Sequence, residues 1–555
     1  MEKCLQTKDS NCKNCYKCIR NCPVKSLKFT EGQAHIIHNE CILCGQCYVV
    51  CPQNAKQIRN DLDKAKNILK SGKKVFASLA PSFVLWYDGK NIFDICQALK
   101  KLGFTDVNET AIGATIVKKE YEKMIEEGKS LIISSCCHSV NALIQKHFTD
   151  AINYLAPVVS PMMAHAISIK KENPDAKVIF IGPCISKKAE ADKYPGVVDC
   201  VLTFEELDNL LSENNITVES NSISVEKGRA SSFPTSGGIL ECMDKKDNFN
   251  YIAIDGLQNC IDALREIEAG NMKDCFIEMS ACAGSCLAGP LMKRKKHNPI
   301  KNLVAIKDYT GNQDFKTNDI GDKKNKKFEF EGIAKTSFSS QAINEILRKM
   351  GKSSHQQELN CGSCGYDTCR EKAEAVLMGK ADLTMCLPFL KDKAENFSDT
   401  VINNTPNGII VLNEQLEIQQ INKAAKNILN LPENMDIVNS PVVRILDPVD
   451  YVVALEGGEN VYDRKKYLVE YQKYVEETIV CDKEYQVIMI IIKDVSGEEK
   501  IRTQKESASK AAVEITDKVV EKQMRVVQEI ASLLGETTAE TKIALTKLKE
   551  TLSDE

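Results

Sequence analysis

The chain has 555 residues, a formal net charge of −4 and 24 cysteines. At roughly 150 residues per domain, this length predicts three to four domains. A content of 43% apolar and 27% charged residues excludes a disordered or fibrous chain. The small net charge gives no electrostatic reason to expect a nucleic-acid partner, and no apolar run approaches the length of a membrane span. Residues 1–4 carry no apolar signal sequence, so we expect a cytoplasmic protein whose cysteines bind metal.

Residues 1–60 contain the spacing C-x2-C-x2-C-x3-C-P twice, which is typical of two-cluster bacterial ferredoxins. In that arrangement three cysteines of each run bind one [4Fe–4S] cluster, and the fourth binds the other cluster. The spacing therefore predicts one cluster on Cys12, Cys15, Cys18 and Cys51, and a second on Cys41, Cys44, Cys47 and Cys22. Structural zinc is the less favoured alternative.

Residues 61–298 alternate short apolar runs with helical patterns, which predicts a mostly parallel sheet with both faces covered. Helices are expected at residues 91–102, 112–127, 139–148 and 161–171. Strands are expected at residues 130–134, 177–181 and 275–279, and each leads directly into cysteines. In parallel sheets ligands bind at the carboxyl ends of the strands, so four thiolates from three loops are expected to meet on one buried cofactor.

These three loops resemble the signature loops of [FeFe]-hydrogenases, whose usual forms are T-S-C-C-P, M-P-C-x-x-K-x-x-E and E-x-M-A-C-x-x-G-C. The chain has S-S-C-C-H at residues 134–138, G-P-C-x-x-K-x-x-E at 182–190 and E-M-S-A-C-x-x-x-C at 278–286. The segments A-P-S at 80–82 and F-P-T-S-G-G at 233–238 also resemble family segments that line the cofactor. The resemblance covers residues 74–290 and the ferredoxin module.

The resemblance implies an H-cluster, a [4Fe–4S] cubane joined through one cysteine sulfur to a two-iron centre with CO, CN⁻ and a dithiolate bridge. Carried over by position, the cubane ligands are Cys137, Cys184, Cys282 and Cys286, of which Cys286 supplies the bridging sulfur. Lys187 is implied to donate a hydrogen bond to a cyanide. Cys136 is implied to be a proton-relay thiol, although a free cysteine is most often a packing residue. The cofactor pocket is implied to be lined by Ala80, Pro81, Ser82 and Phe233.

Several positions depart from the usual family pattern. Gly182 and Ser280 stand where methionines normally pack against the two-iron centre, so a roomier and more polar pocket is expected. In the proton path, Lys118 and Lys119 replace the first carboxylate and Ala156 replaces a serine. Glu190 is expected either to orient a neighbouring loop or to lie on a helix surface. Because these substitutions resemble those of the family's sensory branch, slow turnover with retained H2 binding is expected.

Residues 299–340 are polar and lysine-rich, which predicts a linker or irregular extension, and the basic run 293–297 is expected to be solvated surface. Residues 341–392 resemble the small four-cysteine iron–sulfur domain of electron-transfer proteins. A helix expected at 370–380 would return the fourth cysteine to the other three, which predicts one further [4Fe–4S] cluster on Cys361, Cys364, Cys369 and Cys386. A structural zinc ribbon is the alternative.

Residues 393–498 change to strands expected at 408–412, 417–421, 467–475 and 485–495 with a helix at 423–429, and resemble a PAS domain. Residues 499–555 are expected to form C-terminal signalling or dimerisation helices, because valines and leucines recur every seven residues. Gly535 is expected to end the first helix. A helical hairpin and a dimer stalk are both compatible with this pattern, and a simple packing helix is the alternative.

The predicted fold is therefore multidomain α/β and α+β: a two-cluster ferredoxin, an α/β H-cluster domain, a small helical iron–sulfur domain, a PAS domain and C-terminal helices. The favoured function is reversible H2 oxidation in H2 sensing with low turnover. The alternatives are a fully catalytic ferredoxin-linked hydrogenase and an electron-transfer protein without the two-iron centre. The implied partners are H2, protons, a redox partner such as ferredoxin, hydrogenase maturation proteins, a signalling effector and a second copy of the chain.

Overall fold

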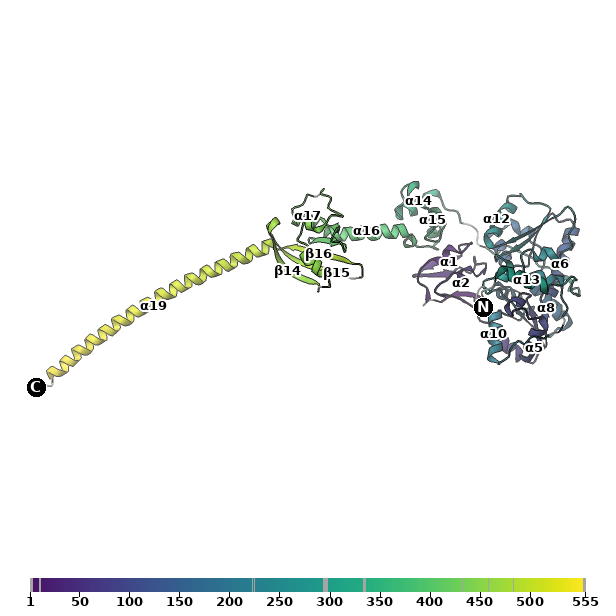
Figure 1. Ribbon diagram of the computed structural model, residues 1–555, viewed down its shortest axis with the longest axis horizontal. Helices are drawn as coiled ribbons and strands as arrows, with labels where there is room; N and C mark the ends of the chain where they lie inside the picture. The colour runs from purple at the N-terminus through teal and green to yellow at the C-terminus, as the bar shows by residue number, and fades with distance from the viewer. Residues whose placement is uncertain are drawn as a thin grey trace. The chain divides into compact units, whose positions relative to one another are not determined.

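The computed structural model describes residues 3–8, 11–221, 223, 225–292, 298–332, 336–432, 434–457, 459–482 and 484–552. The basic run 293–297 therefore lies outside the described residues. The chain forms two compact units, residues 1–390 and 391–555 (Figure 1). No helix in the described ranges combines the length and apolar character that a membrane crossing requires.

The N-terminal module contains two small antiparallel sheets and two one-turn helices. β1 (Leu5–Thr7) pairs with β4 (Lys56–Ile58), and β2 (Leu27–Thr30) pairs with β3 (Gln33–Ile36). α1 (Lys17–Arg20) and α2 (Gln46–Val49) lie within the two cysteine runs and contain Cys18 and Cys47. Tyr16 and Gly45, which precede these helices, have φ values of 54° and 76°, so the backbone turns sharply where each run enters its helix. The predicted ferredoxin fold is confirmed.

Two parallel sheets form the core of residues 61–298. One has the order β6 (Asp106–Glu109), β5 (Val75–Leu79), β8 (Lys177–Ile181) and β9 (Cys200–Leu202). The other has the order β10 (Asn250–Asp255), β11 (Cys275–Ser280) and β7 (Leu131–Ile133). The central strands β5, β8 and β11 are apolar runs that are buried along almost their whole length, as expected for parallel strands with both faces covered. The single sheet expected from the sequence is thus divided in two.

Helices cover these sheets. They are α3 (Leu62–Leu69), α4 (Phe83–Trp86), α5 (Ile92–Lys101), α6 (Ala111–Glu126), α7 (His138–His147), α8 (Pro161–Glu172), α9 (Ser186–Lys193), α10 (Phe204–Glu213), α11 (Gly238–Cys242) and α12 (Leu257–Glu268). Capping boxes begin α5 at Asn91 and α10 at Thr203. In α6, Gly113 packs against α8, and a Cβ atom there would lie 2.1 Å from the carbonyl oxygen of Pro161.

The segment expected to be a linker, residues 299–340, instead packs on the α/β core. It begins with α13 (Pro299–Tyr309), in which Ile306 is fully buried, and the Tyr309 hydroxyl donates a 2.8 Å hydrogen bond to Glu109. Further along, Phe315 and Phe328 are buried in two different parts of the core. The interpretation as a linker was wrong, because scattered tertiary contacts hold this segment on the core, whereas the described residues between α13 and residue 340 are mostly irregular, as expected.

The four-cysteine segment is helical and belongs to the first unit. α14 (Ser340–Lys349) packs against α15 (Cys369–Leu377) through Ile343, Ile346 and Leu347, and α16 (Leu387–Asn404) begins at the residue after Cys386. The segment also contacts the ferredoxin module, where Arg20 Nη1 donates a 2.9 Å hydrogen bond to the carbonyl oxygen of Ser363. These contacts bring the two modules together within one unit.

The second unit contains a five-stranded antiparallel sheet in the order β13 (Ile418–Ile421), β12 (Gly408–Leu412), β16 (Val487–Asp494), β15 (Lys473–Asp482) and β14 (Val461–Leu468), with α17 (Lys423–Ile428) and α18 (Val449–Leu455) (Figure 1). A strand expected at residues 467–475 is instead the turn between β14 and β15. The sheet's inner face is aliphatic, with Ile410, Ile479 and Ile490 fully buried. This architecture confirms the predicted PAS fold.

A single helix, α19 (Ser496–Leu552), follows the PAS sheet. The expected break at Gly535 is not present, so residues 496–552 do not form a hairpin. A glycine in a helix interior costs about 1 kcal/mol relative to alanine, which does not interrupt so long a helix. The valines that recur at seven-residue intervals, among them Val513, Val520 and Val527, are more than half exposed.

Candidate functional site

Four cysteines from three strand ends meet in one cavity of about 40 Å³ between the two parallel sheets. Cys137 follows β7, Cys184 follows β8, and Cys282 and Cys286 follow β11, and all four line this cavity. Cys44 of the ferredoxin module lines it too. Burial and, to a smaller extent, the neighbouring thiols of Cys184 and Cys137 together raise the pKa of Cys286 to about 12. So many thiols in the wall of one cavity favour metal coordination over free thiols.

The donor set fits a [4Fe–4S] cluster. Its four ligands are soft sulfur atoms, and the other polar side chains of the cavity wall are only the hydroxyls of Ser139, Ser280 and Ser285. In the described ranges, no three His, Cys, Asp or Glu side chains converge closely enough to bind a single metal ion. Four cysteine thiols with no histidine or carboxylate among the described residues of the cavity wall are a ligand set that such a cluster uses.

A second cavity of about 110 Å³ adjoins the first. Two of the cubane cysteines, Cys184 and Cys286, line both cavities. The wall of the second cavity also contains every residue that was expected to line the cofactor pocket or to take part in catalysis. These residues are Ala80, Pro81, Ser82, Cys136, Lys187 and Phe233. Ser82 Oγ is buried and has no hydrogen-bond partner among the described residues. An unsatisfied hydroxyl beside a largely apolar cavity is consistent with a group that binds there.

The wall contains further residues that sequence reasoning did not identify, namely Thr110, Ala111, Ala114, Pro161, Met162 and Phe180. They come from the starts of α6 and α8 and from β8, and no motif marks them. The expectation of a roomier, more polar pocket was wrong at Gly182. A Cβ atom at Gly182 would lie 2.7 Å from the ring of Phe180, so that ring occupies the space. Ser280 lines the first cavity, that of the four loop cysteines (the cubane cavity), where its hydroxyl lies 3.0 Å from that of Ser285.

Lys187 is the only lysine among the described residues that line this second cavity. Its Nζ atom lies 2.6 Å from Glu190 Oε2 and 3.1 Å from the carbonyl oxygen of Cys136. Burial lowers the pKa of Lys187, but Glu190 and the thiols of Cys184 and Cys137 more than offset this and raise it. The ammonium is therefore held in its charged form beside the cavity.

Glu190 is fully buried, which excludes the helix-surface interpretation. Burial raises its pKa, yet Lys187 and Lys326 outweigh that effect and hold the pKa at about 2. Lys326 Nζ lies 3.6 Å from Glu190 Oε1 and belongs to the segment once expected to be a linker. Glu190 therefore orients Lys187 and ties residues 299–340 to the site.

Cys136 also lines the second cavity, and its thiol contacts a tyrosine. Cys136 Sγ lies 3.2 Å from the hydroxyl of Tyr121, which lies 3.1 Å from Ser135 Oγ. Ser135 Oγ donates a 2.8 Å hydrogen bond to the carbonyl oxygen of Val158. Burial raises the pKa of Cys136 to about 12, so the thiol keeps its proton. These hydrogen bonds connect the thiol to a carbonyl group and not to a carboxylate.

The departures in the proton path have structural consequences. Lys118 is almost fully buried in α6, with Nζ 2.6 Å from Asp314 Oδ2 and 3.5 Å from Glu122 Oε1. Lys119 is exposed and donates a 3.0 Å hydrogen bond to Thr317. Ala156 is buried and offers no hydroxyl. A paired lysine ammonium at this position cannot accept a proton.

The ferredoxin cysteines group across the two runs. Burial raises the pKa of Cys41, Cys44 and Cys47, and in each case the nearby thiol of Cys22 raises it further. Burial also raises the pKa of Cys18, and there the contributing thiols are Cys12, Cys51 and Cys15. Each group of four is the crosswise set predicted from the spacing. The set that contains Cys44 lies next to the cubane cavity.

The four later cysteines also share a cavity, of about 20 Å³. Its wall includes Cys361, Cys364, Cys369 and Cys386 together with Tyr366 and Lys372. Four cysteine thiols are ligands that a [4Fe–4S] cluster and a structural zinc ion both use. This site fits a third [4Fe–4S] cluster outside the α/β core.

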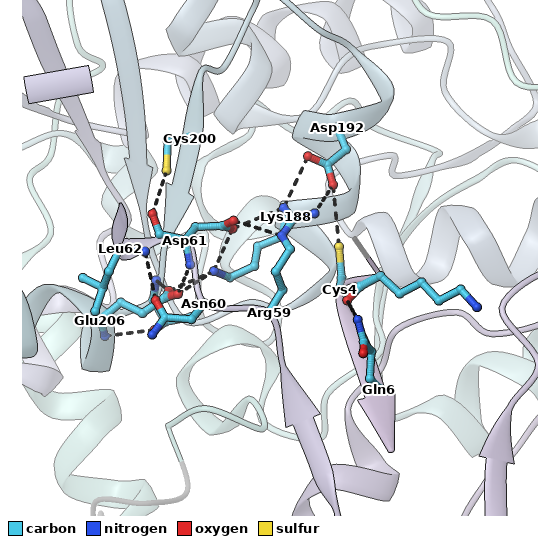
Figure 2. A network of polar contacts seen from close by, with 12 residues as sticks. Cys4, Gln6, Arg59, Asn60, Asp61, Leu62, Lys188, Asp192, Cys200 and Glu206 are labelled. Atoms are coloured by element: carbon cyan, nitrogen blue, oxygen red, sulfur yellow. Dashed lines mark hydrogen bonds and ion pairs between the residues drawn. The ribbon is translucent and has the colours of Figure 1, made fainter. Parts of the chain in front are cut away.

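A buried ionic network attaches the ferredoxin module to the helix that carries Lys187 (Figure 2). In α9, Lys188 Nζ lies 2.9 Å from Asp61 Oδ2 and 2.8 Å from Glu206 Oε1. Arg59, at the end of the ferredoxin module, pairs with Asp61 at 2.9 Å and with Asp192 of α9. Lys188 is fully buried, so its charge depends on these carboxylates. The network fixes α9, and with it the loop of Cys184.

Comparisons with known proteins agree with this architecture. Residues 73–290 match the family model for the C-terminal domain of the iron only hydrogenase large subunit. Residues 34–57 match the 4Fe-4S binding domain, residues 357–388 the Fe-S cluster family and residues 396–464 the PAS domain.

Curated relatives are 23–24% identical to the chain over the aligned residues. Iron hydrogenase 1 of Clostridium pasteurianum is 24% identical over 43% of the chain and 53% of its own length. The NADP-reducing hydrogenase subunit HndD of Solidesulfovibrio fructosivorans is 24% identical over 52% of the chain and 63% of its own length. Nuclear prelamin A recognition factor of Xenopus laevis is 23% identical over 46% of the chain and 75% of its own length. The chain thus spans about half of the Clostridium relative.

Among solved structures, a variant of the [FeFe]-hydrogenase HydA1 from Chlamydomonas reinhardtii covers 50% of this chain and 100% of its own, with 17% identity and a TM-score of 0.39. The family models and the arrangement of the four loop cysteines carry the assignment. The chain is therefore a hydrogenase-like multidomain protein, in which a domain similar to the C-terminal domain of the iron only hydrogenase large subunit at residues 73–290 occurs together with ferredoxin-type, iron–sulfur and PAS domains.

Proposed function

We propose that the chain binds H2 and oxidises it reversibly to two protons and two electrons at an H-cluster, with slow turnover, as an H2 sensor. The observation that carries this proposal is the pair of adjoining cavities that share Cys184 and Cys286. One cavity brings together the four implied cubane ligands, and the other brings together Lys187 and Cys136. When bound, the H-cluster would supply the iron that binds H2 and the bridge amine that accepts one of its protons.

The residues of the chain would then act in distinct ways. Cys137, Cys184, Cys282 and Cys286 would hold the cubane, and Cys286 would also reach the two-iron centre. Lys187, kept charged by Glu190, would donate a hydrogen bond to a cyanide. The thiol of Cys136 would exchange a proton with the bridge amine, which requires hydrogen-bond reach. The apolar side chains of Phe180, Phe233 and Met162 would exclude water.

Slow turnover follows from the surroundings of Cys136. A proton that leaves the thiol along its hydrogen bonds would reach Tyr121, Ser135 and finally the carbonyl oxygen of Val158, which is too weak a base to take it up at neutral pH. Further along the implied proton path, the ammonium of Lys118 cannot accept a proton and Ala156 has no hydroxyl to pass one on. In a sensor, slow turnover lets the oxidation state of the clusters follow the H2 level. The PAS domain and α19 then point to a signalling effector and to a second copy of the chain as partners.

A second candidate is a fully active ferredoxin-linked hydrogenase, and Glu278 is the observation that favours it. Burial raises the pKa of Glu278 to about 7, and its charge contributes to the high pKa of Cys136. A carboxyl group with a pKa near 7 is suited to proton relay. However, its oxygens accept hydrogen bonds from the backbone N–H groups of Gly237, Ile239 and Leu240, which fixes Glu278 at the start of α11.

The experiment is H2 exposure of the anaerobically matured full chain, followed by EPR of its clusters and by a dye-reduction assay. The proposal predicts that H2 reduces the clusters stoichiometrically while steady-state dye reduction stays at least about 100-fold below that of a control hydrogenase. A rate equal to the control would establish the second candidate. Clusters that dithionite reduces but H2 does not would overturn both, and would leave an electron-transfer role. Maturation proteins and a low-potential redox partner such as ferredoxin complete the proposed set of partners.

A further inference from the structure

The cavity of the four later cysteines has a buried lysine in its wall. Lys372 lies in α15, one turn after Cys369, and only 1% of its surface is exposed. Its Nζ atom donates a hydrogen bond to the carbonyl oxygen of Asp382 and lies 5.7 Å from the ring centroid of Tyr366. Both contacts keep the ammonium inside the domain and beside the cysteines.

No carboxylate pairs directly with this charge. Within 4 Å of Lys372 Nζ, the described residues contribute no acidic side chain, whereas Lys188 has two carboxylate partners. Burial lowers the pKa of Lys372 to about 8, and the thiol of Cys364, the carboxylate of Asp382 and the thiol of Cys386 act in the opposite direction, the first of them most strongly. A buried ammonium needs a negative partner, and a cluster with four thiolate ligands is an anion. A cluster bound to these cysteines would therefore supply a negative counter-charge for Lys372.

The same centre lies against the ferredoxin module. Lys25 Nζ donates a 2.8 Å hydrogen bond to the carbonyl oxygen of Gly365, and Lys380 Nζ lies 2.7 Å from Glu40 Oε2. A Cβ atom at Gly365 would lie 2.8 Å from Ile19, so the two backbones approach closely where the cysteine loop meets α1. Cys364 belongs to the same buried cluster of side chains as Cys18, Cys22 and Cys47.

We propose that Lys372 raises the reduction potential of the four-cysteine centre, so that this centre accepts and holds an electron from the ferredoxin module. A fixed positive charge stabilises the reduced cluster, which carries one more negative charge than the oxidised cluster. In the transfer, the centre on Cys22, Cys41, Cys44 and Cys47 loses one electron and the four-cysteine centre gains it, and no proton or bond changes. With H2 as the electron source the inference rests on the proposed function.

The holding site lies where the chain leaves the first unit. α16 begins at Leu387, directly after Cys386, and the Leu390 N–H donates a 2.9 Å hydrogen bond to the carbonyl oxygen of Cys386. A change in the charge of this centre therefore acts on the first turn of the helix through which the chain continues into the second unit. This gives the electron held there a direct connection to the signalling part of the chain.

The test is EPR of the full chain at fixed solution potentials, set with dithionite and redox mediators so that no step depends on H2 or on the two-iron centre. The signal of the four-cysteine centre is assigned by its loss in Cys361→Ser. Lys372→Gln keeps a donor for Asp382 but removes the charge, and is expected to lower the ratio of reduced to oxidised centre about tenfold, equal to about 59 mV for one electron. Lys372→Arg is expected to stay within about twofold of the wild type.

Lys349→Met is the matched control, because Lys349 is an exposed lysine on α14 of the same domain that pairs with Glu345 at 2.9 Å. It is expected to leave the ratio unchanged. A Lys372→Gln ratio equal to that of the wild type would overturn the proposal. If Lys372→Gln and Lys372→Met both fail to assemble the centre, Lys372→Arg decides. An arginine centre with the wild-type ratio of reduced to oxidised cluster supports the role of the charge, and an arginine centre whose ratio falls about tenfold overturns it.

Discussion

The hydroxyl of Tyr121 lies 3.2 Å from the Sγ atom of Cys136 and accepts a 2.8 Å hydrogen bond from the backbone N–H of Ser135. Tyr121 is fully buried in α6, one turn after Lys118. The tyrosine therefore occupies the position at which a proton leaving Cys136 would need an acceptor.

Tyr121→Phe tests whether protons leave through the tyrosine. Because the path ends at the carbonyl oxygen of Val158, we expect the H2 oxidation rate per loaded H-cluster to stay within about twofold of the wild type. The variant should lose about 1–3 kcal/mol of stability, since the buried Ser135 N–H loses its acceptor. Glu278→Gln provides the comparison. A tenfold loss of rate in Tyr121→Phe alone would show that Tyr121 is the exit, and a loss in Glu278→Gln alone would place the exit at Glu278.

Lys118→Glu tests whether a carboxylate can simply be restored to the proton path. We expect a destabilised protein without faster turnover, because the new carboxylate would face Asp314 and Glu122. Loss of the buried cation costs about 3–5 kcal/mol. Thermal unfolding followed by the visible absorption of the clusters measures the effect. Lys119→Glu, at the exposed neighbouring position, should change stability by about 0.5 kcal/mol or less. A stable and faster Lys118→Glu variant would contradict the role given to Lys118.

The network of Figure 2 predicts a strong dependence on Lys188. Lys188→Met should destabilise the first unit by about 3–5 kcal/mol, because Asp61 and Glu206 lose their buried partner. Lys193→Met on the same helix removes a half-exposed lysine that pairs with Glu331 and should cost about 0–1 kcal/mol. Adding Glu206→Gln to Lys188→Met should recover part of the loss. Equal effects of the two single variants would show that the network contributes little.

His165 predicts a dependence of stability on pH. Burial lowers its pKa from 6.5 to about 4, and its Nδ1 atom shares a 2.8 Å hydrogen bond with Ser78 Oγ. The unfolded chain takes up a proton on this residue below pH 6.5, whereas the folded chain does not until about pH 4. The contribution of His165 to the free energy of unfolding is therefore fully present above pH 6.5, and it falls by up to about 1.4 kcal/mol per pH unit below that pH. His165→Asn should make the unfolding temperature change less between pH 7 and pH 5 than it does in the wild type. If the unfolding temperature of this variant depended on pH as in the wild type, groups other than His165 would cause the dependence.

Sequence spacing predicted the parts of the site that depend on local geometry. Cys137, Cys184 and Cys282 each follow a strand, so their meeting at strand ends was predictable. The spacing also predicted that Cys18 lies near Cys51 of the other run, and that Cys22 lies near Cys41. The division into two sheets was not, because periodicity identifies strands but not their neighbours.

Other features depend on contacts between distant parts of the chain. The burial of Glu190 depends on Lys326, which lies in a segment without a periodic apolar pattern. The ring of Phe180 occupies the space beside Gly182. The glycine in the sequence does not by itself reveal this packing. Gly535 remains helical because a single exposed glycine costs too little to end α19.

Infrared spectroscopy of the anaerobically matured full chain tests the central claim most directly, because CO and CN⁻ bands arise only from a loaded two-iron centre. The account predicts these bands in the wild type and their loss in Cys286→Ser, with the EPR signals of the ferredoxin clusters retained. Bands that persist in Cys286→Ser would contradict the bridging role of Cys286. Absence of the bands in the wild type, under conditions that mature a control hydrogenase, would contradict H2 chemistry at this site altogether.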